Sequence, residues 1–354
     1  MFRIGLVGCG AVAEMHWSSG YAALLASAPE VVRLVAACDP RPERLAAFVE
    51  RAQAAIPGAR VKGYTRVEDL LADPEVDGVD LCVPHRAHAP LALQALATGK
   101  HVLVEKPIAD TVAGAEQMVA AATRAGLTLC VNENYPFSEP FRRARRLIND
   151  GRLGKLCIVR SHRVGYLGGV WLRDGWRQRA ELAGGGMLLD QGCHYTNILR
   201  LLARDVAGEI THVHAYATTN RPDFTGEDTA TVNLRFEQGL IGSQFYCWAT
   251  RTTNVGAEAY IYGEEGHLEV NSRSPTLTLF HRDLPGGSEV VYDRPDYAET
   301  FARSIEDFAR AAMGERAPTM PGTEGLADLR VVEAAYRSIK SGREEPVQPA
   351  PPTP

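Results

Sequence analysis

Short, continuous apolar runs alternate with longer Ala- and Leu-rich segments over about the first 130 residues. The runs predict strands at Phe2–Val7, Val31–Cys38, Val61–Tyr64, Gly78–Val83, His101–Glu105 and Thr128–Val131. The longer segments predict helices at Val12–Ala26, Pro42–Ile56, Val67–Ala72, Ala89–Thr98 and Val112–Ala125. A strand that is apolar at nearly every position is buried on both faces, and strands of this kind alternating with helices are typical of a doubly wound parallel sheet. We therefore expect an α/β Rossmann domain over residues 1–131.

The pattern changes after Asn132, where many runs alternate apolar and polar residues as a strand with one exposed face does. Such strands are expected at Leu156–Val164, Ile210–Thr219, Thr229–Phe236, Ile241–Thr250, Ala257–Tyr262, Gly266–Val270, Thr276–His281 and Glu289–Tyr292. Helices are expected at Pro140–Asn149, Tyr297–Met313 and Gly325–Ser341. We expect an α+β domain over residues 132–345 with a large, mostly antiparallel open sheet, followed by a Pro-rich, disordered tail at 346–354.

The composition is that of an ordinary globular protein, with 45% apolar and 23% charged residues and a net charge of −5. No basic run suggests nucleic acid or an anionic membrane as a partner. No segment reaches the roughly 18 apolar residues of a membrane helix, and no secretory signal is recognisable. The seven cysteines contain no Cys-x-x-Cys pair, so they indicate neither a zinc site nor a disulfide framework. We expect a cytoplasmic protein without a metal site.

A dinucleotide-binding fingerprint, Gly8-x-Gly10-x-x-Ala13, lies between the first expected strand and the first expected helix. Its glycines permit a tight turn and a close approach of the backbone to a pyrophosphate, which faces the helix N-terminus. Cofactor contacts are therefore expected from Gly8, Gly10, Ala11 and Val12.

The second expected strand closes on an acidic residue, Asp39, whose carboxylate can bind the ribose hydroxyls of NAD and repel a 2′-phosphate. Arg41 and Arg44 follow it. They could meet a 2′-phosphate, or they are solvated charges at the start of a helix. NAD is the expected cofactor, with Asp39 and Arg41 beside it, and NADP stays open.

Three segments together resemble the Gfo/Idh/MocA family of oxidoreductases, which includes glucose–fructose oxidoreductase and inositol dehydrogenase. They are the glycine fingerprint, Glu105-Lys106-Pro107, and the run from Gly184 to His194. The resemblance implies a Rossmann domain followed by an α/β domain whose open sheet often forms the oligomer interface. A homodimer or homotetramer is therefore expected.

The same resemblance implies roles for single residues. Lys106, Asp190 and His194 match the catalytic residues of the family, and Glu105 matches the glutamate of its lysine motif. Many members have Asp three residues after the histidine, whereas this chain has Asn197.

Two further segments match positions near the cofactor and substrate. Pro84 and His88 resemble the family's segment under the nicotinamide. Asn134 and Tyr135 lie in a segment that often carries an Asn and an aromatic residue or Arg close to the substrate. We expect Asn134 to contact the cofactor and Tyr135 the substrate.

Oxidation of a secondary alcohol needs a base for the hydroxyl proton and a group that stabilises charge on the oxygen. His194 suits the first role and Lys106 the second. Asp190 and His194 are four residues apart, so in a helix they would share one face. The alternative is that Asp190 is a helix N-cap and His194 a surface residue.

A Gly-rich loop before this segment carries Trp171, Arg173, Trp176 and Arg177. Aromatic faces and guanidinium groups suit a polar, ring-shaped substrate, so these residues are expected to bind it. Packing of the loop between subunits is the alternative. His85 and His88 have a His-x-x-His spacing, but no ligand cluster accompanies them, which argues against a metal there.

These features predict an NAD-dependent dehydrogenase that oxidises a ring secondary alcohol of a sugar, a sugar derivative or a cyclitol to a ketone, or that catalyses the reverse. A reductase of a non-sugar carbonyl, imine or diene is one alternative. A catalytically silent, dinucleotide-binding regulator is another.

Overall fold

The computed structural model describes residues 1–55, 60–252 and 256–349. Its contacts divide the chain into two compact units. The first contains Met1–Asn134 and Ala298–Leu326, and the second contains Tyr135–Tyr297 and the chain from Ala327 on. The sequence placed 298–326 in the second domain, whereas in the structure this segment packs with the first.

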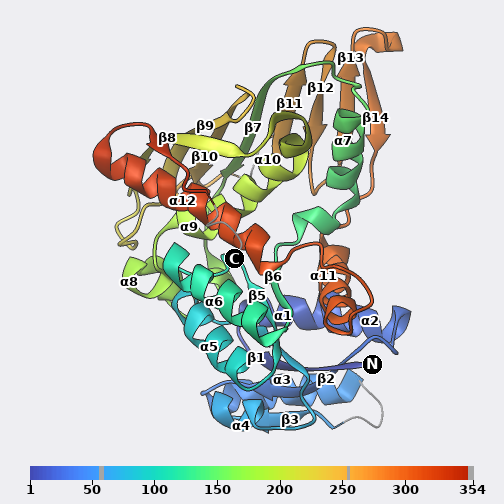
Figure 1. Ribbon diagram of the computed structural model, residues 1–354, viewed down its shortest axis with the longest axis vertical. Helices are drawn as coiled ribbons and strands as arrows, with labels where there is room; N and C mark the ends of the chain where they lie inside the picture. Colours follow the sequence, from blue (N-terminus) through green and yellow to red (C-terminus); the bar gives the residue numbers. More distant parts are fainter. Residues whose placement is uncertain (56–59, 253–255, 350–354) are drawn as a thin grey trace. The chain divides into compact units, whose positions relative to one another are not determined.

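The first unit is built on a six-stranded parallel sheet with the strand order β3-β2-β1-β4-β5-β6 (Figure 1). Its strands are β1 (Phe2–Val7), β2 (Val32–Cys38), β3 (Lys62–Tyr64), β4 (Gly78–Leu81), β5 (His101–Glu105) and β6 (Leu129–Asn132). Central positions such as Ile4, Val79 and Leu103 are completely buried, which explains the continuous apolar runs. The predicted doubly wound parallel sheet is confirmed.

Most helices of this unit begin and end within one residue of the predicted bounds, whereas α5 begins at His85, four residues before the predicted Ala89. They are α1 (Ala11–Met15), η1 (His16–Tyr21), α2 (Ala22–Ser27), α3 (Pro42–Ala55), α4 (Val67–Leu71), α5 (His85–Ala97) and α6 (Val112–Ala125). Ile56, the expected last residue of α3, lies outside the described residues. The single helix expected over Val12–Ala26 is interrupted by a π-helical stretch, η1, which the 3.6-residue pattern does not reveal.

Helix α11 (Tyr297–Ala312) joins the first unit through its apolar face. Ile305 and Phe308 belong to the same buried cluster as Phe2, Leu24 and Phe48. The rings of Phe2 and Phe308 meet edge to face at a centroid distance of 5.5 Å. This buried contact explains why α11 packs with the first unit although it follows the second sheet in sequence.

The second unit contains a nine-stranded sheet with the order β14-β13-β12-β11-β7-β10-β9-β8-β15. Its strands are β7 (Leu156–Val164), β8 (Ile210–Thr218), β9 (Thr229–Phe236), β10 (Ile241–Cys247), β11 (Ala259–Gly263), β12 (Gly266–Val270), β13 (Leu277–His281), β14 (Ser288–Tyr292) and β15 (Glu345–Pro346). Neighbouring strands are antiparallel except for the parallel pair β7 and β10. The predicted mostly antiparallel sheet is confirmed.

Helices accompany this sheet in the second unit. They are α7 (Glu139–Asn149), α8 (Ala180–Ala183), α9 (Met187–Asp190) and α10 (Gly192–Ala207), together with α12 (Gly322–Ser341), most of which belongs to this unit. Short 3-10 turns lie at η2 (Tyr135–Phe137), η3 (Gly169–Leu172), η4 (Trp176–Gln178) and η5 (Pro285–Gly287). Helix α10 packs on β7 and β10, and α7 packs on β12 and β13.

The start of the expected disordered tail is ordered. Glu345 and Pro346 pair with β8, and the amide of Val347 donates to the carbonyl of Thr211 at 2.8 Å. The edge of a sheet offers unpaired main-chain groups, which a Pro-rich segment can still use in part. Residues 350–354 of the tail lie outside the described residues.

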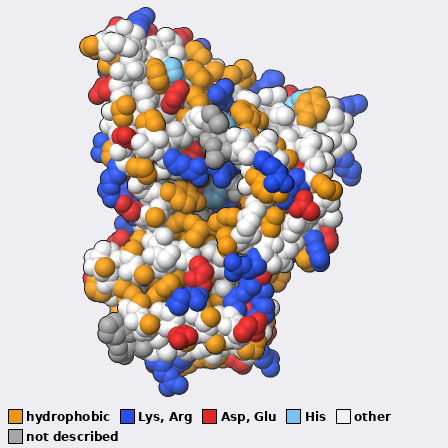
Figure 2. All heavy atoms as spheres, turned by 180° about the vertical axis from the view of Figure 1, so that it is seen from behind, with side chains coloured by type: hydrophobic (Ala, Val, Ile, Leu, Met, Phe, Trp, Pro, Cys, Tyr) orange, Lys and Arg blue, Asp and Glu red, His pale blue; other side chains and the backbone are white. Residues whose placement is uncertain are grey.

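The surface carries charges of both signs, and Lys and Arg side chains are interspersed with Asp and Glu on the face in Figure 2. Within the described residues, no helix is long and apolar enough to cross a membrane. The cysteines are free thiols, and only Cys157 is exposed.

Candidate active site

The glycine fingerprint forms a turn between β1 and α1. Gly8 has a φ of 90°, and a Cβ atom at this position would collide with the carbonyl of Cys82. Gly10 is the N-cap residue of α1, and Ala11 and Val12 open the helix. The turn therefore requires glycine at position 8, and it leads into the N-terminus of α1, the kind of position where a phosphate can be bound.

Asp39 lies directly after β2 and supports this turn. Its Oδ2 accepts the amide of Cys9 at 2.9 Å, and its Oδ1 accepts the amide of Arg41 at 2.9 Å. The guanidinium of Arg41 lies 3.3 Å from Oδ1. Arg41 is thus more than a solvated charge, since it pairs with the carboxylate that the sequence assigned to the ribose.

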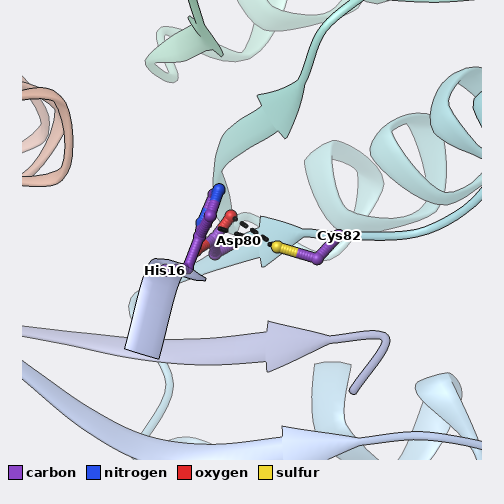
Figure 3. Close-up of side chains that lie close together, drawn as sticks. All are labelled: His16, Asp80 and Cys82. Atoms are coloured by element: carbon purple, nitrogen blue, oxygen red, sulfur yellow. Dashed lines mark hydrogen bonds and ion pairs between the residues drawn. The ribbon is translucent and has the colours of Figure 1, made fainter. Parts of the chain in front are cut away.

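The opposite end of the first helical segment brings a histidine into the protein interior. His16, the first residue of η1, is completely buried; its Nδ1 lies 2.7 Å from Oδ2 of Asp80 and its Nε2 lies 2.8 Å from Oε1 of Glu105. Figure 3 shows His16 and Cys82 converging on Asp80 from η1 and from the end of β4. Tyr21 donates its hydroxyl to the same Asp80 oxygen at 2.7 Å.

Opposite charges dominate the protonation of this cluster. Burial on its own lowers the pKa of His16, but the charge and hydrogen bond of Asp80 outweigh it, so that the pKa lies well above its ordinary value. Burial raises the pKa of Glu105, yet His16, Lys106 and Asn132 together bring it down to about 2. His16 is therefore an imidazolium between two carboxylates.

The possible metal-ligand atoms of His16, Asp80 and Cys82 (an imidazole nitrogen, a carboxylate oxygen and the thiol sulfur) lie within 4.8 Å of one another. A metal ion could bridge atoms at this separation. Burial and the charge of Asp80 raise the pKa of the Cys82 thiol, whereas a metal binds the thiolate. The imidazole nitrogens already bond the two carboxylates. These three residues therefore fit a hydrogen-bonded charge cluster better than a metal site.

Lys106 follows the last residue of β5 at the carboxyl edge of the sheet, and it is partly exposed. The neighbouring Glu105 is the register partner of Asn132 at the end of β6, and the Asn132 amide donates to Glu105 at 2.7 Å. Ligands of open α/β sheets bind at this edge. Lys106 thus lies where the sequence placed a catalytic group.

His88 holds the turn that carries Lys106. It is completely buried in α5, with Nδ1 2.7 Å from the carbonyl oxygen of Pro107 and Nε2 3.0 Å from that of Val83. Burial lowers its pKa. His88 therefore links two loops at the carboxyl edge, whereas Pro84, the N-cap residue of α5, is exposed there.

Asn134 is buried at the end of the first unit. Its amide donates to the hydroxyl of Thr300 in α11 at 3.0 Å. This bond fixes the segment after β6 to the segment that returns from later in the chain.

In the second unit, the Gly184–Gly186 run positions α9. Gly184 has a φ of 86°, and a Cβ at Gly186 would collide with the backbone of Glu227. The Glu227 carboxylate accepts the amides of Gly186 at 3.1 Å and Leu188 at 3.0 Å, and the hydroxyl of Tyr336 at 2.7 Å. Gly186 is thus required for a close approach to Glu227, a residue that the sequence analysis did not identify.

Asp190 is the last residue of α9 and is buried. Its Oδ2 accepts a hydrogen bond from Nε of Arg177 at 2.9 Å, and its Oδ1 accepts one from the side-chain Nε2 of Gln191 at 3.0 Å. The guanidinium of Arg177 lies 4.3 Å from the ring centroid of Trp176 and 5.4 Å from that of Trp171. The expected substrate loop is therefore joined to the expected catalytic carboxylate, while Arg173 is exposed.

His194 lies in the first turn of α10, with 9% of its surface exposed. Its ring meets Tyr135 edge to face at 5.5 Å. Asp190 and His194 are not in one helix, so the condition under which they would share a helix face is not met: Gln191 separates α9 from α10. Asp190 is also no N-cap, and His194 is no surface residue.

Tyr135 and Asn197 have buried partners of their own. The ring of Tyr135 packs against that of Phe141 at a centroid distance of 5.0 Å. Its hydroxyl donates to Oε1 of Glu258 at 3.5 Å. Asn197 donates to Asp328 of α12 at 2.8 Å. Asn197, which stands where many family members have Asp, thus donates a hydrogen bond to a carboxylate. An Asp at this position could make the same bond only if it or Asp328 were protonated.

Residues 2–133 match the model of the oxidoreductase family with an NAD-binding Rossmann fold, and residues 141–269 match that of the GFO/IDH/MocA C-terminal domain. The chain is 30% identical to the 1,5-anhydro-D-fructose reductase of Ensifer adhaerens, over 98% of this chain and 99% of that protein. It is 27% identical to inositol 2-dehydrogenase 2 of Saccharopolyspora erythraea, over 99% and 96%. The WlbA dehydrogenase of Bordetella pertussis, solved with NADH and UDP-GlcNAcA, has a TM-score of 0.81 and 27% identity over 99% of both chains.

Proposed function

Because the chain belongs to the Gfo/Idh/MocA family of NAD-binding oxidoreductases, we propose that it oxidises a ring secondary alcohol of a sugar, a sugar derivative or a cyclitol to a ketone, or catalyses the reverse reaction. The observation that supports this best is the shared position of the glycine turn, the exposed Pro84 and Lys106 at the carboxyl edge of one parallel sheet. Relatives named for an anhydrosugar and an inositol support the substrate class.

The first unit offers a fitting site for NAD. Gly8 allows the tight turn, since a Cβ there would collide with the carbonyl of Cys82, and Gly10, Ala11 and Val12 begin the helix that follows. Asp39 supplies the acceptor for ribose hydroxyls. The bound cofactor supplies hydride acceptance or donation.

The protein residues supply charge and proton transfer. We assign Lys106 to the reacting oxygen, where its ammonium donates a hydrogen bond and stabilises the developing negative charge. His194 accepts the hydroxyl proton during oxidation and returns it during reduction. Asp190, held by Arg177, accepts a hydrogen bond from a substrate hydroxyl, and Trp171 and Trp176 provide apolar faces for the ring.

A panel of sugars, nucleotide sugars, aminosugars and inositols, assayed with NAD⁺ for absorbance of NADH, tests this proposal. Turnover of one class supports it. If the protein turns over only carbonyl, imine or diene substrates with NADH, the proposed dehydrogenase function is wrong and the reductase function takes its place. NADH binding without any turnover, together with a protein partner, would favour the regulator.

We further propose that the open face of the large sheet is an interface between copies of this chain. Ile158 and Ile241 are register partners on this face and are 37% and 52% exposed, and Tyr216 is 61% exposed. An uncovered apolar sheet face is typical of an association surface. An Ile241→Glu variant should have a lower mass in light scattering than the wild type.

The free thiols fit a reducing cytoplasm as the compartment.

A further inference from the structure

A buried polar cluster of the first unit contacts the residue next to Lys106. We name it the His16 cluster, and it consists of His16, Tyr21, Asp80, Cys82, Glu105 and Asn132. His16, Asp80 and Glu105 are 0%, 0% and 8% exposed. Every member is at most 9% exposed, so the cluster is part of the protein interior and is not an open substrate pocket.

A chain of short contacts leads through the cluster to the lysine. Asp80 holds Nδ1 of His16 at 2.7 Å, and Nε2 of His16 holds Glu105 at 2.8 Å. Glu105 is the last residue of β5 and precedes Lys106 directly. The backbone position of Lys106 thus depends on Glu105, whose carboxylate is held by His16.

We propose that His16 is a positioning residue, which holds the Glu105 carboxylate ionised and in place beside Lys106. The inference rests on the proposed function only in taking Lys106 to be catalytic. It assigns to the buried imidazolium a role that the dinucleotide fingerprint and the lysine motif do not contain.

The charges that face the pair are complementary. Asp80, Tyr21 and Cys82 face His16 from β4 and η1, and the Phe301 ring of α11 lies edge to face with it at 5.6 Å. The charge of Lys106 also acts on Glu105 and lowers the pKa of its carboxyl, and Glu105 in turn acts on His88 of α5. His16 is the buried cation of this set, so its removal leaves Asp80 and Glu105 without their shared counter-charge.

Local backbone geometry supports a dedicated role. The six-residue π-helical stretch begins at His16 and turns His16, Trp17, Gly20 and Tyr21 inward. π-helical turns are uncommon and often accompany functional sites. An uninterrupted α-helix would rotate the residues after His16, and Tyr21 with them, away from Asp80.

Lysine NMR gives a test that needs no substrate. The chain has five lysines, Lys62, Lys100, Lys106, Lys155 and Lys340. Protein labelled with ¹³C at lysine Cε therefore gives few signals, and a Lys106→Arg variant assigns the relevant one. Its chemical shift is followed against pH in the wild type, in His16→Gln and in a control, His101→Gln, which replaces a half-buried histidine outside the cluster.

In the wild type and the control, we expect the Lys106 signal to show no step in the acid range above about pH 4, because Glu105 stays ionised there. In His16→Gln, a second step should appear above about pH 4.3, the pKa of an unperturbed glutamate, because Glu105 then takes up a proton. An unchanged Lys106 curve in His16→Gln overturns the proposal. If this variant does not fold, ¹³C-histidine spectra of Asp80→Asn decide.

In those spectra, the wild-type His16 should still be charged at about pH 8, and Asp80→Asn should lower its pKa by at least one unit. A wild-type His16 that titrates at or below about pH 6.5 overturns the proposal. With a substrate in hand, His16→Gln should lower kcat about tenfold and leave the dissociation constant of NADH unchanged. If Lys106→Ala retained its turnover while these spectra behaved as expected, the proposed function alone would fail.

Discussion

The guanidinium of Arg177 donates from Nε to Oδ2 of Asp190 at 2.9 Å, and 5% of the Asp190 side chain is exposed. The same guanidinium lies over the Trp176 ring. A loop between β7 and α8 thus orients a carboxylate in α9, and the bond leaves Asp190 as a hydrogen-bond acceptor. This bond supports the proposed mechanism, in which His194 rather than Asp190 accepts the proton.

Replacing Arg177 by Ala should lower kcat/KM by about 10- to 100-fold, because a hydrogen bond to a charged group contributes about 1.5–3 kcal/mol and each 1.4 kcal/mol is tenfold in rate. Steady-state kinetics on the substrate found by the panel measures this. Arg179→Ala, an exposed arginine of the same loop, is the matched control. An equal loss of kcat/KM in both variants would contradict a specific role of the Arg177–Asp190 bond. It would show instead that activity depends on the conformation of the whole loop.

Gly8→Ala should abolish NADH binding, since its Cβ would collide with the Cys82 carbonyl. Gly126→Ala is the control, because Gly126 also has a positive φ, of 64°, but has open space around it. The control should lose about 1–2 kcal/mol of stability and bind NADH normally. Fluorescence titration with NADH separates the two, and normal affinity in Gly8→Ala would contradict the assignment of the turn.

Asp39→Asn should weaken NADH binding about tenfold and affect NADPH less. The change removes the negative charge that accepts ribose hydroxyls and repels a 2′-phosphate, while Arg41 remains beside it. Dissociation constants for both cofactors give the ratio. A ratio unchanged from the wild type would mean that Asp39 only supports the glycine turn.

Glu105 should make stability depend on pH in the acid range. Its pKa is lowered to about 2 in the folded protein, so its contribution is present above the ordinary glutamate pKa and is lost as pH falls through about 2. The contribution is about 3 kcal/mol. Urea unfolding should find Glu105→Gln less stable than the wild type at pH 7, with a gap that narrows toward pH 3. A difference in unfolding free energy that stays constant between pH 7 and pH 3 would contradict an ionised Glu105.

The regular elements could be predicted because their patterns are local. His101–Glu105, Val112–Ala125 and Leu156–Val164 begin and end at the predicted residues. Burial on both faces of one sheet and on one face of the other produced these patterns directly. The glycine turn could be predicted as well, since Gly8 needs a φ that other residues avoid.

The contacts of the candidate site depend on residues far apart in sequence, which periodicity does not encode. His16 bonds Asp80 and Glu105, separated from it by 64 and 89 positions. A buried histidine in a helix has no pattern that distinguishes it from a core position. The acidic Asp80 within an otherwise apolar strand was the available signal, because a buried carboxylate requires a partner.

The start of α9 also depends on a distant residue. Glu227, two residues before β9, accepts the amides of Gly186 and Leu188. The run of three glycines was the available signal for this contact, but it does not identify the partner.

The most direct measurement is the turnover of Lys106→Ala and His194→Ala on the substrate that the NAD⁺ panel identifies, with Lys155→Ala, an exposed lysine, as control. Both variants should fold, bind NADH as the wild type does, and lose at least 100-fold in kcat, as expected when charge stabilisation or proton transfer is removed. The control should keep its activity. Wild-type turnover in both catalytic variants would contradict the proposed dehydrogenase mechanism.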